Sequence, residues 1–330
     1  MNTFIFTCGD INGVGPELVI KTLNRVTMKS KDKFIFILPE NVFFSEIKMH
    51  KPNFGYDIVN STSYSSDFPV TIVNIGNYKQ ELGLPTTASG QASYKALKIA
   101  YDIPVKSINK AVITAPISKT ALAYAKINYH GQTEMFADWS EVKNFAMMFL
   151  SKSMKAALLT IHQPIKKVPR LIRKDLLATK FNLILDSLRK DFKVELPKIA
   201  VLGLNPHAGE NGLIGDEEKK IIVPFMKKFS KRKYFFGPYS SDAFFGMKKY
   251  LEFDMVIGMY HDQILNAFKL MNFNSGVNFT AGLPIVRTSP DHGTAFDIAG
   301  KGIADESSMI EAFNYAEMIL VNRSSYGKNS

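Results

Sequence analysis

Residues 276–305 read GVNFTAGLPIVRTSPDHGTAFDIAGKGIAD, and this stretch directs the interpretation of the whole chain. It contains five glycines, although each glycine costs conformational entropy on folding. A segment that only packs in the core does not need so many glycines, whereas backbone that approaches a flat or charged ligand closely needs them. Arg287 follows the apolar run 283–286, so we expect it at a strand end, where α/β sheets collect their ligands. A guanidinium there suits a phosphate or a carboxylate, and the alternative is a surface loop with a solvated arginine.

The composition is that of a globular protein with a large core. Of 330 residues, 46% are hydrophobic and 22% are charged, which predicts two domains and argues against disorder. The net charge is +11, but the lysines are scattered, so we expect phosphorylated small molecules rather than nucleic acid as partners. The single cysteine, Cys8, fits a reducing compartment. Without a basic leader or a long apolar run, we expect a cytoplasmic protein that does not enter a membrane.

Strand and helix patterns alternate along the chain. Strands are predicted at 3–7, 34–38, 70–73, 111–114, 146–150, 156–161, 198–204 and 254–260, and helices at 89–101, 173–192, 216–229 and from about 306 onwards. This alternation predicts an α/β fold with a mostly parallel sheet covered on both faces. The turn GDINGVGPE at 9–17 resembles a phosphate-cradling element, although its spacing matches neither the Rossmann fingerprint nor the P-loop.

Three of the six histidines directly follow predicted strands. His162 follows 156–161, His207 follows 198–204 and His261 follows 254–260. Parallel strands end at one edge of a sheet, so the three imidazoles could converge on a catalytic divalent metal. For each histidine alone, the alternative is an ordinary hydrogen-bonding role. His50 lies in a polar loop and is expected to be solvated.

Four polar residues near these histidines each allow two interpretations. Asp242 either takes part in the chemistry or caps a helix. Asp262 either orients His261 as a metal ligand or has no such role. Lys269 either pairs with a substrate anion or is a surface lysine, and Asn278 either holds a polar substrate group or serves in a turn.

Seven stretches of the chain together resemble one enzyme family. They are GDINGVGPE, TAPISK, GQTE, LGLNPHAGENGLIGDEE, GPYSSD, MYHDQ and residues 276–305. In this order, over nearly the whole chain, they are similar to the 4-hydroxythreonine-4-phosphate dehydrogenase family of pyridoxal phosphate biosynthesis. HGTAFDIAGKGIAD also resembles the cofactor loop of isocitrate and isopropylmalate dehydrogenases, which share the fold.

The resemblance implies two α/β/α subdomains with the active-site cleft between them. Residues 1–125 and 285–330 would form the first subdomain, with the cofactor loop. Residues 126–284 would form the second, with the metal histidines and the dimer interface. The implied active unit is a homodimer whose sites form at the subunit interface.

The resemblance also implies a reaction. It is the NAD-dependent and divalent-metal-dependent oxidation of 4-phosphooxy-L-threonine to 2-amino-3-oxo-4-phosphooxybutanoate, which decarboxylates to 3-amino-2-oxopropyl phosphate. The metal would be zinc, magnesium or cobalt, and the cofactor NAD or NADP, with carboxylates beside the ribose favouring NAD. The nearest alternative is a dehydrogenase of threonate or erythronate phosphate. A phosphate acyltransferase is a further alternative, against which the three histidines and the HGTAFDIAG loop argue. A non-catalytic binding module is another, against which the intact set of three histidines and Asp242 argues.

The resemblance assigns roles to individual residues, grouped by what they would bind. The metal ligands would be His162, His207 and His261; the substrate contacts Gln132, Thr133, Lys269, Asn278 and Arg287; the catalytic residues Asp242 and Lys269; and the cofactor contacts His292, Gly293, Thr294, Ala295, Asp297 and Asp305. Gln132 stands where the family usually has histidine, so it can hydrogen-bond but cannot titrate near neutrality. Ile264 replaces a usual glycine, which we interpret as a packing change.

Overall fold

The computed structural model describes residues 1–60, 66–103, 109–129 and 131–326. Its contacts divide the chain into two compact units, Met1–Glu141 with Leu283–Ser330 and Val142–Gly282. The sequence placed the first boundary near residue 125, whereas helix α5 (Gln132–Trp139) belongs to the first unit. The reason is aromatic packing, because the Trp139 ring lies against Tyr94 and Tyr101 of α3 (Thr87–Asp102).

A parallel sheet forms the centre of the first unit. In the part of the chain that the structure describes, its strand order is β3-β4-β2-β1-β5-β12, and neighbouring strands pair in parallel. The strands are β1 (Thr3–Thr7), β2 (Lys33–Leu38), β3 (Tyr56–Val59), β4 (Val70–Asn74), β5 (Lys110–Thr114) and β12 (Val286–Pro290). Phe4, Phe6, Phe34 and Phe36 are completely or almost completely buried, as expected for a sheet covered on both faces.

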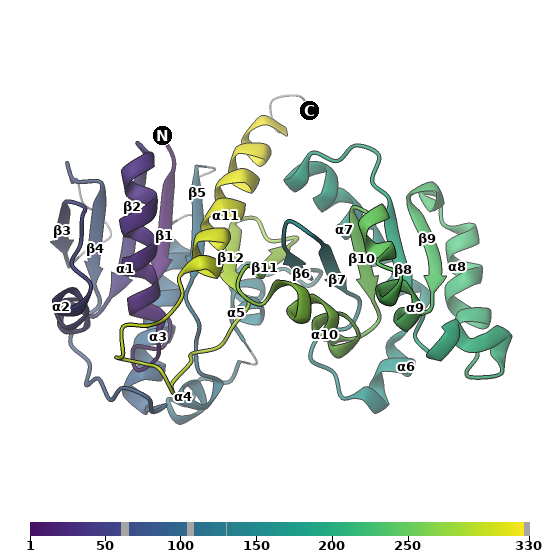
Figure 1. Cartoon of the computed structure of the whole chain (residues 1–330), viewed down its shortest axis with the longest axis horizontal. Helices are drawn as coiled ribbons and strands as arrows, with labels where there is room; N and C mark the ends of the chain where they lie inside the picture. The colour runs from purple at the N-terminus through teal and green to yellow at the C-terminus, as the bar shows by residue number, and fades with distance from the viewer. Residues whose placement is uncertain (61–65, 104–108, 130, 327–330) are drawn as a thin grey trace. The chain divides into compact units, whose positions relative to one another are not determined.

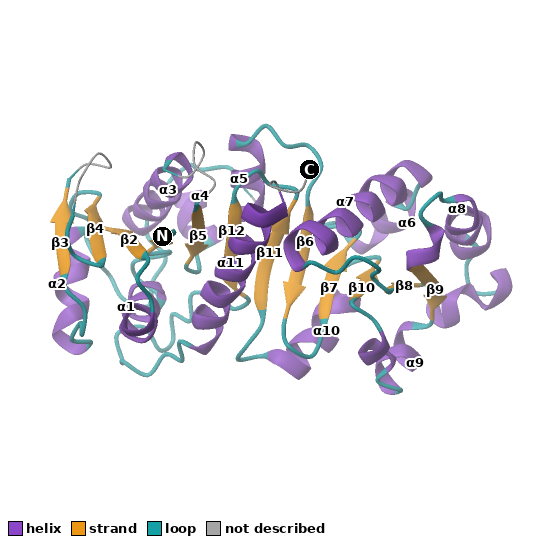
Figure 2. Cartoon of the chain, turned by 90° about the horizontal axis from the view of Figure 1, so that it is seen from above, coloured by secondary structure: helices purple, strands orange, loops and turns teal. Residues whose placement is uncertain are grey.

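Helices cover both faces of this sheet (Figures 1 and 2). Helices α1 (Gly15–Val26), α2 (Glu40–Met49) and α11 (Ser307–Tyr326) lie on one face, and α3, α4 (Lys119–Tyr124) and α5 lie on the other. The helix predicted at 89–101 is confirmed as α3, and Ala92, Ala96 and Ala100 form its fully buried face. A capping box between Thr86 and Ser89 fixes where α3 begins.

The second unit has a mixed sheet that is parallel in its larger part. Its strand order is β11-β6-β7-β10-β8-β9, and the strands are β6 (Ala146–Leu150), β7 (Lys155–Leu158), β8 (Ile199–Leu202), β9 (Phe235–Tyr239), β10 (Met255–Gly258) and β11 (Val277–Ala281). Strands β7, β10, β8 and β9 pair in parallel, whereas β6 pairs antiparallel with both β7 and β11. The short connection 151–154 allows only a hairpin between β6 and β7.

The helices of the second unit also lie on two faces of its sheet (Figure 2). Helices α6 (Val168–Leu171), α7 (Lys174–Phe192) and α8 (Val223–Lys228) lie on one face, and α9 (Ser241–Gly246) and α10 (His261–Asn272) on the other. The short helical turns of the chain are Thr27–Lys29, Ile165–Lys167, Pro206–Gly212, Glu218–Ile222, Arg232–Tyr234 and Lys249–Glu252. None of the described helices is both long and apolar enough to span a membrane.

Candidate active site

The three strand-end histidines lie on one edge of the second unit. His162, His207 and His261 come shortly after β7, β8 and β10, three parallel strands that are neighbours in the sheet. Parallel strands that are neighbours present their carboxyl ends at the same edge. The sequence-based placement of each histidine after a strand is therefore confirmed.

Two of these histidines face each other. The ring centroids of His162 and His261 lie 5.8 Å apart. The Nδ1 atom of His261 lies 2.7 Å from Oδ1 of Asp262. An Nδ1 proton donated to that carboxylate leaves Nε2 as the electron-pair donor of the ring, which is how a carboxylate orients a metal-ligating histidine.

The segment that carries His207 has an unusual backbone. His207, Ala208, Glu210 and Asn211 all have φ between 43° and 57°, and His162 has φ of 49°. Left-handed conformations cost non-glycine residues roughly 1–2 kcal/mol each. Such strain persists where the surrounding structure enforces it, commonly at functional sites.

Glu218 binds the residues that lead into this segment. Its side chain is buried, and its Oε1 accepts hydrogen bonds from the backbone N–H groups of Leu204 and Asn205 at 2.7 and 2.8 Å. Its Oε2 accepts a further bond from Nδ2 of Asn205 at 2.9 Å. A Cβ atom on Gly209 would lie 2.7 Å from Glu218 Oε2, so the loop closes tightly over the carboxylate. The sequence reasoning did not single out Glu218, although it is the last residue of the LGLNPHAGENGLIGDEE stretch.

The donor chemistry at this edge suits a divalent metal ion. Imidazole nitrogens bind zinc and cobalt well, and His162 and His261 bring two of them together. Within the described residues, no group of three His, Cys, Asp or Glu side chains is arranged to hold a metal ion. The structure thus brings two of the three predicted ligands together, and the role of His207, which lies at the same edge, stays a prediction.

The structure also locates the polar residues predicted near the histidines. Asp242 is exposed in the first turn of α9, and a hydrogen bond from Ser240 Oγ holds the pKa of its carboxyl below the usual range. The charge of His207 also lowers this pKa, by a smaller amount. Lys269 is partly buried in the last turn of α10. Asn278 is paired with Phe149 within β11, so it is not a turn residue.

In the first unit, Arg287 forms the centre of a buried polar cluster. It was expected at a strand end, but it is the second residue of β12 and is 3% exposed. Pro284 lies in the apolar run that precedes it and lacks the N–H group of a sheet residue, so the strand begins only at Val286. Burial lowers the pKa of Arg287 to about 10, which leaves the guanidinium charged at neutral pH.

The guanidinium joins three elements. It donates to Oγ1 of Thr114 from Nη2 at 2.7 Å and from Nε at 3.1 Å, and to Oγ1 of Thr133 at 3.3 Å. Its Nη2 also donates to Oε1 of Gln132 at 2.9 Å, while Nε2 of Gln132 donates to the carbonyl of Ala115 at 2.9 Å. Gln132 and Thr133 open helix α5, so the predicted substrate contacts Gln132, Thr133 and Arg287 are brought together.

The predicted cofactor loop lies in the same unit and packs against the GDINGVGPE turn. The backbone N–H of Val14 donates to the carbonyl of Thr294 at 3.0 Å, and a Cβ on Gly13 would lie 2.6 Å from that oxygen. Asp10 and Asn12 of the turn are fully buried. The turn therefore supports the 292–305 loop and is not an open phosphate cradle.

The members of the loop differ in their surroundings. His292, Gly293, Thr294 and Ala295 form its start, and Nδ1 of His292 lies 3.0 Å from the carbonyl oxygen of Gly293. Asp297 is exposed. Asp305 instead accepts hydrogen bonds from the backbone N–H and the hydroxyl of Ser307 at 2.9 and 2.6 Å, at the start of α11, and these bonds lower its pKa. Of the two carboxylates assigned to the cofactor, Asp305 is already engaged with the first residue of α11, and Asp297 is the one assigned to the ribose.

The structure also tests two further predictions, the packing role of Ile264 and the solvent exposure of His50. Ile264 is fully buried and packs over Gly258, where a Cβ would lie 2.2 Å from its Cγ1, which agrees with a packing change. His50 is not solvated, because only 11% of its side chain is exposed and its Nε2 lies 3.7 Å from Oε1 of Glu17.

Comparison with known proteins gives consistent matches along the chain. A model of the family described as pyridoxal phosphate biosynthetic protein PdxA matches residues 26–316. A 4-hydroxythreonine-4-phosphate dehydrogenase from Prosthecochloris aestuarii is 38% identical over 98% of both chains. A relative from Oceanobacillus iheyensis, provisionally named a D-threonate 4-phosphate dehydrogenase, is 35% identical over 94% of this chain and 95% of its own.

Solved structures match equally well. The 4-hydroxythreonine-4-phosphate dehydrogenase of Klebsiella pneumoniae has a TM-score of 0.81 and 31% identity, covering 97% of this chain and 100% of its own. The isocitrate dehydrogenase of Methylococcus capsulatus, at 13% identity, has a TM-score of 0.50 and covers 99% of this chain and 88% of its own. This second similarity concerns the fold alone, and it confirms the predicted fold class.

Proposed function

Because this chain belongs to the pyridoxal phosphate biosynthetic protein PdxA family, we propose that it oxidises 4-phosphooxy-L-threonine with NAD. The product is 2-amino-3-oxo-4-phosphooxybutanoate, which loses carbon dioxide to give 3-amino-2-oxopropyl phosphate. The observation that carries the proposal is 38% identity over 98% of this chain to a 4-hydroxythreonine-4-phosphate dehydrogenase. The paired imidazoles and the buried guanidinium support it with suitable chemistry.

The cofactor and the metal supply chemistry that protein side chains lack. NAD accepts the hydride, and a divalent ion, zinc, magnesium or cobalt, polarises the oxygen it binds. His162, His207 and His261 are the residues assigned to hold the ion. The contact between His261 and Asp262 fixes the tautomer that this role requires.

Arg287 is assigned to the phosphate of the substrate. Its guanidinium is buried and still charged at neutral pH, so it can bind an anionic group of the substrate in addition to its protein partners. A planar guanidinium also suits phosphate better than an ammonium does, because it donates two parallel hydrogen bonds. Gln132 and Thr133 hold the guanidinium, so they join the phosphate contacts.

Asp242 and Lys269 are assigned to proton transfer, and Lys269 and Asn278 to further substrate contacts. Oxidation of the secondary alcohol releases the hydroxyl proton together with the hydride. The lowered pKa of Asp242 makes this carboxylate a weak base at neutral pH. We therefore assign Asp242 as an ionised partner in this transfer and keep Lys269 as the second residue assigned to it.

A second candidate is the oxidation of a threonate 4-phosphate. Two observations favour it, namely the 35% identical relative with that provisional name and Gln132 in place of an imidazole. The two substrates differ at the carbon beside the carboxylate, which carries an amine in one and a hydroxyl in the other.

A substrate panel tests the choice between the two. NADH formation is measured with 4-phosphooxy-L-threonine, D-threonate 4-phosphate and D-erythronate 4-phosphate at equal concentrations. We expect the highest kcat/KM with 4-phosphooxy-L-threonine. A tenfold or greater preference for either phosphorylated sugar acid would replace the first assignment by the second.

The assembly and the location follow from the same assignment. The active unit is assigned as a homodimer in the cytoplasm, with sites at the subunit interface. Light scattering of the purified protein tests the dimer, since one chain has a mass of 37.0 kDa. A mass near that of one chain at the concentrations used for assays would contradict it.

A further inference from the structure

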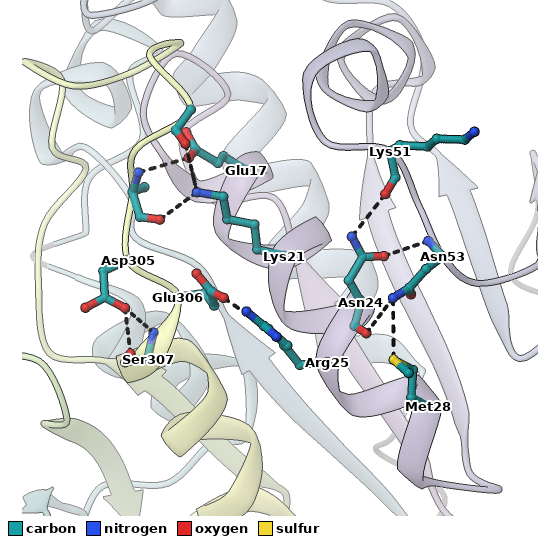
Figure 3. Close-up of polar contacts among 12 residues, drawn as sticks. Glu17, Lys21, Asn24, Arg25, Met28, Lys51, Asn53, Asp305, Glu306 and Ser307 are labelled. Atoms are coloured by element: carbon teal, nitrogen blue, oxygen red, sulfur yellow. Dashed lines mark hydrogen bonds and ion pairs between the residues drawn. The ribbon is translucent and has the colours of Figure 1, made fainter.

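Helix α1 holds the last part of the 292–305 loop through a partly buried ion pair, in which Glu17 is the buried member. Glu17 is 2% exposed, and its Oε1 accepts hydrogen bonds from Nζ of Lys21 at 2.7 Å and from the backbone N–H of Ala304 at 2.9 Å (Figure 3). Lys21 Nζ also donates to the carbonyl oxygens of Gly302 at 3.1 Å and Ala304 at 2.8 Å. All three donors of this ammonium are therefore used, two of them on the loop backbone.

The same helix also holds the beginning of the loop. The N–H of Val14, just before α1, donates to the carbonyl of Thr294, and Gly13 lets the two backbones touch. The exposed residue Asp297 lies in the sequence between these two anchors. On its other side, α1 is fastened to the 51–53 segment, where Asn24 bonds to Lys51 and Asn53 (Figure 3). The loop is thus attached at both ends to one well-fixed helix.

Fold stability alone does not account for the ion pair. Taking a carboxylate and an ammonium out of water is costly, and apolar residues of similar size often stabilise a fold as well or better. What apolar residues cannot do is hold the N–H and C=O groups of Ala304 and the C=O of Gly302 in fixed positions. The distinct contribution of the pair is therefore the geometry of the loop.

We propose that Glu17 and Lys21 are positioning residues for the dinucleotide cofactor. By fixing the backbone at 302–304, they set how the segment containing Asp297 is presented to the adenosine ribose. This inference rests on the proposed function, which assigns the loop to NAD. Neither residue needs to touch the cofactor for this role.

The test compares three full-length variants in NAD titration calorimetry and steady-state kinetics. Lys21→Met removes all three donated bonds, and we expect the Kd and KM for NAD to rise about tenfold. The kcat and the KM for 4-phosphooxy-L-threonine should change less than about twofold.

Glu17→Gln keeps an acceptor oxygen for Ala304 N–H, so its loss of NAD affinity should be smaller, about threefold. The double variant Glu17→Met/Lys21→Met removes both charges. We expect its Tm to be close to that of wild type, whereas its NAD affinity should be as low as that of Lys21→Met.

The chain offers a matched control on the same helix. Arg25 lies one turn after Lys21, is largely exposed, and pairs with Glu306 at 3.5 Å (Figure 3). Arg25→Met should leave NAD affinity within about twofold of wild type. Wild-type NAD affinity in both Lys21→Met and the double variant would overturn the positioning role while leaving the proposed function intact. If the wild-type protein itself fails to bind NAD, the proposed function is wrong and the inference fails with it.

Discussion

His162 and His261 follow neighbouring strands of one sheet, and their rings lie 5.8 Å apart, centroid to centroid. His261 is also held by Asp262, so one member of the pair has a fixed tautomer. This arrangement brings together two of the three imidazoles that are predicted to bind the metal ion.

The first prediction concerns metal affinity at this pair. His261→Ala should abolish stoichiometric metal in the purified protein. Asp262→Asn should keep the metal but weaken its binding about 10–100-fold, the usual effect of losing a carboxylate that orients a ligating histidine. Metal analysis after dialysis against a competing chelator measures both effects. His50→Asn, a histidine of the other unit, is the control, and full metal content in His261→Ala would remove this histidine from the ligand set.

The second prediction separates two carboxylates of the cofactor loop. Asp297 is exposed, so Asp297→Ala should raise kcat/KM with NADP relative to NAD, by about tenfold, because the carboxylate no longer repels a 2′-phosphate. Asp305 caps α11, so Asp305→Ala should lower stability by about 1 kcal/mol and leave the cofactor ratio unchanged. Kinetics with both cofactors and thermal unfolding measure these effects. The opposite pattern would assign the ribose to Asp305.

The third prediction concerns Arg287. Arg287→Lys should reduce kcat/KM for the phosphorylated substrate about tenfold to a hundredfold, the loss expected for a charge-assisted hydrogen bond. NAD affinity should stay nearly unchanged. Arg323→Lys is the control, because Arg323 is a partly buried arginine of the same unit that donates to the carbonyl of Leu283. Since Arg287 also joins β12, β5 and α5, a fall in Tm and NAD affinity alongside activity would instead indicate a bracing role.

The fourth prediction concerns pH and stability. Burial, and then the charge of Glu17, raise the pKa of Glu46 from 4.5 to about 7 in the folded protein. The folded chain therefore keeps a proton that the unfolded chain loses near pH 4.5. The stability contributed by this proton is present below about pH 4.5 and is lost as the pH rises to about 7, and it amounts to roughly 1–3 kcal/mol.

Glu46→Gln replaces the titrating group with a neutral one of the same shape. Wild type should lose stability as the pH rises from 5 to 8, because Glu46 ionises, and the variant should not. The difference in free energy of unfolding, variant minus wild type, should therefore be larger at pH 8 than at pH 5. Urea unfolding at the two pH values measures this difference. The exposed Glu252 provides the control variant Glu252→Gln. A stability difference between wild type and Glu46→Gln that does not change with pH would show that Glu46 titrates normally.

Much of the fold could be predicted from the sequence, because apolar runs fix strands locally. The run at 111–114 became β5 (Lys110–Thr114), and the run at 198–204 contains β8 (Ile199–Leu202). The histidines after β7, β8 and β10 were likewise placed correctly, since a residue that follows a parallel strand lies at the sheet edge.

The remaining features depend on contacts between distant residues. The left-handed segment at 207–211 contains one glycine, so local preference does not predict its backbone. Glu218, which lies outside the segment, packs against Gly209 and binds the preceding residues Leu204 and Asn205. His50 was expected in solvent, but Glu17 of α1 lies beside it. Arg287 was expected at the end of its strand because residues 283–286 are apolar, whereas Pro284 delays the start of β12. The contact between Glu17 and His50 has no signature in the sequence around His50, whereas the effect of Pro284 lies within residues 283–286 themselves.

The central claim is that this chain is a metal-dependent, NAD-dependent dehydrogenase of 4-phosphooxy-L-threonine. The most direct measurement follows NADH formation from this substrate with the purified protein, before and after chelation of divalent metal. We predict NADH and carbon dioxide in equal amounts, loss of both after chelation, and their return when zinc, magnesium or cobalt is added. No NADH from 4-phosphooxy-L-threonine with metal present, or a rate that chelation leaves unchanged, would contradict the claim.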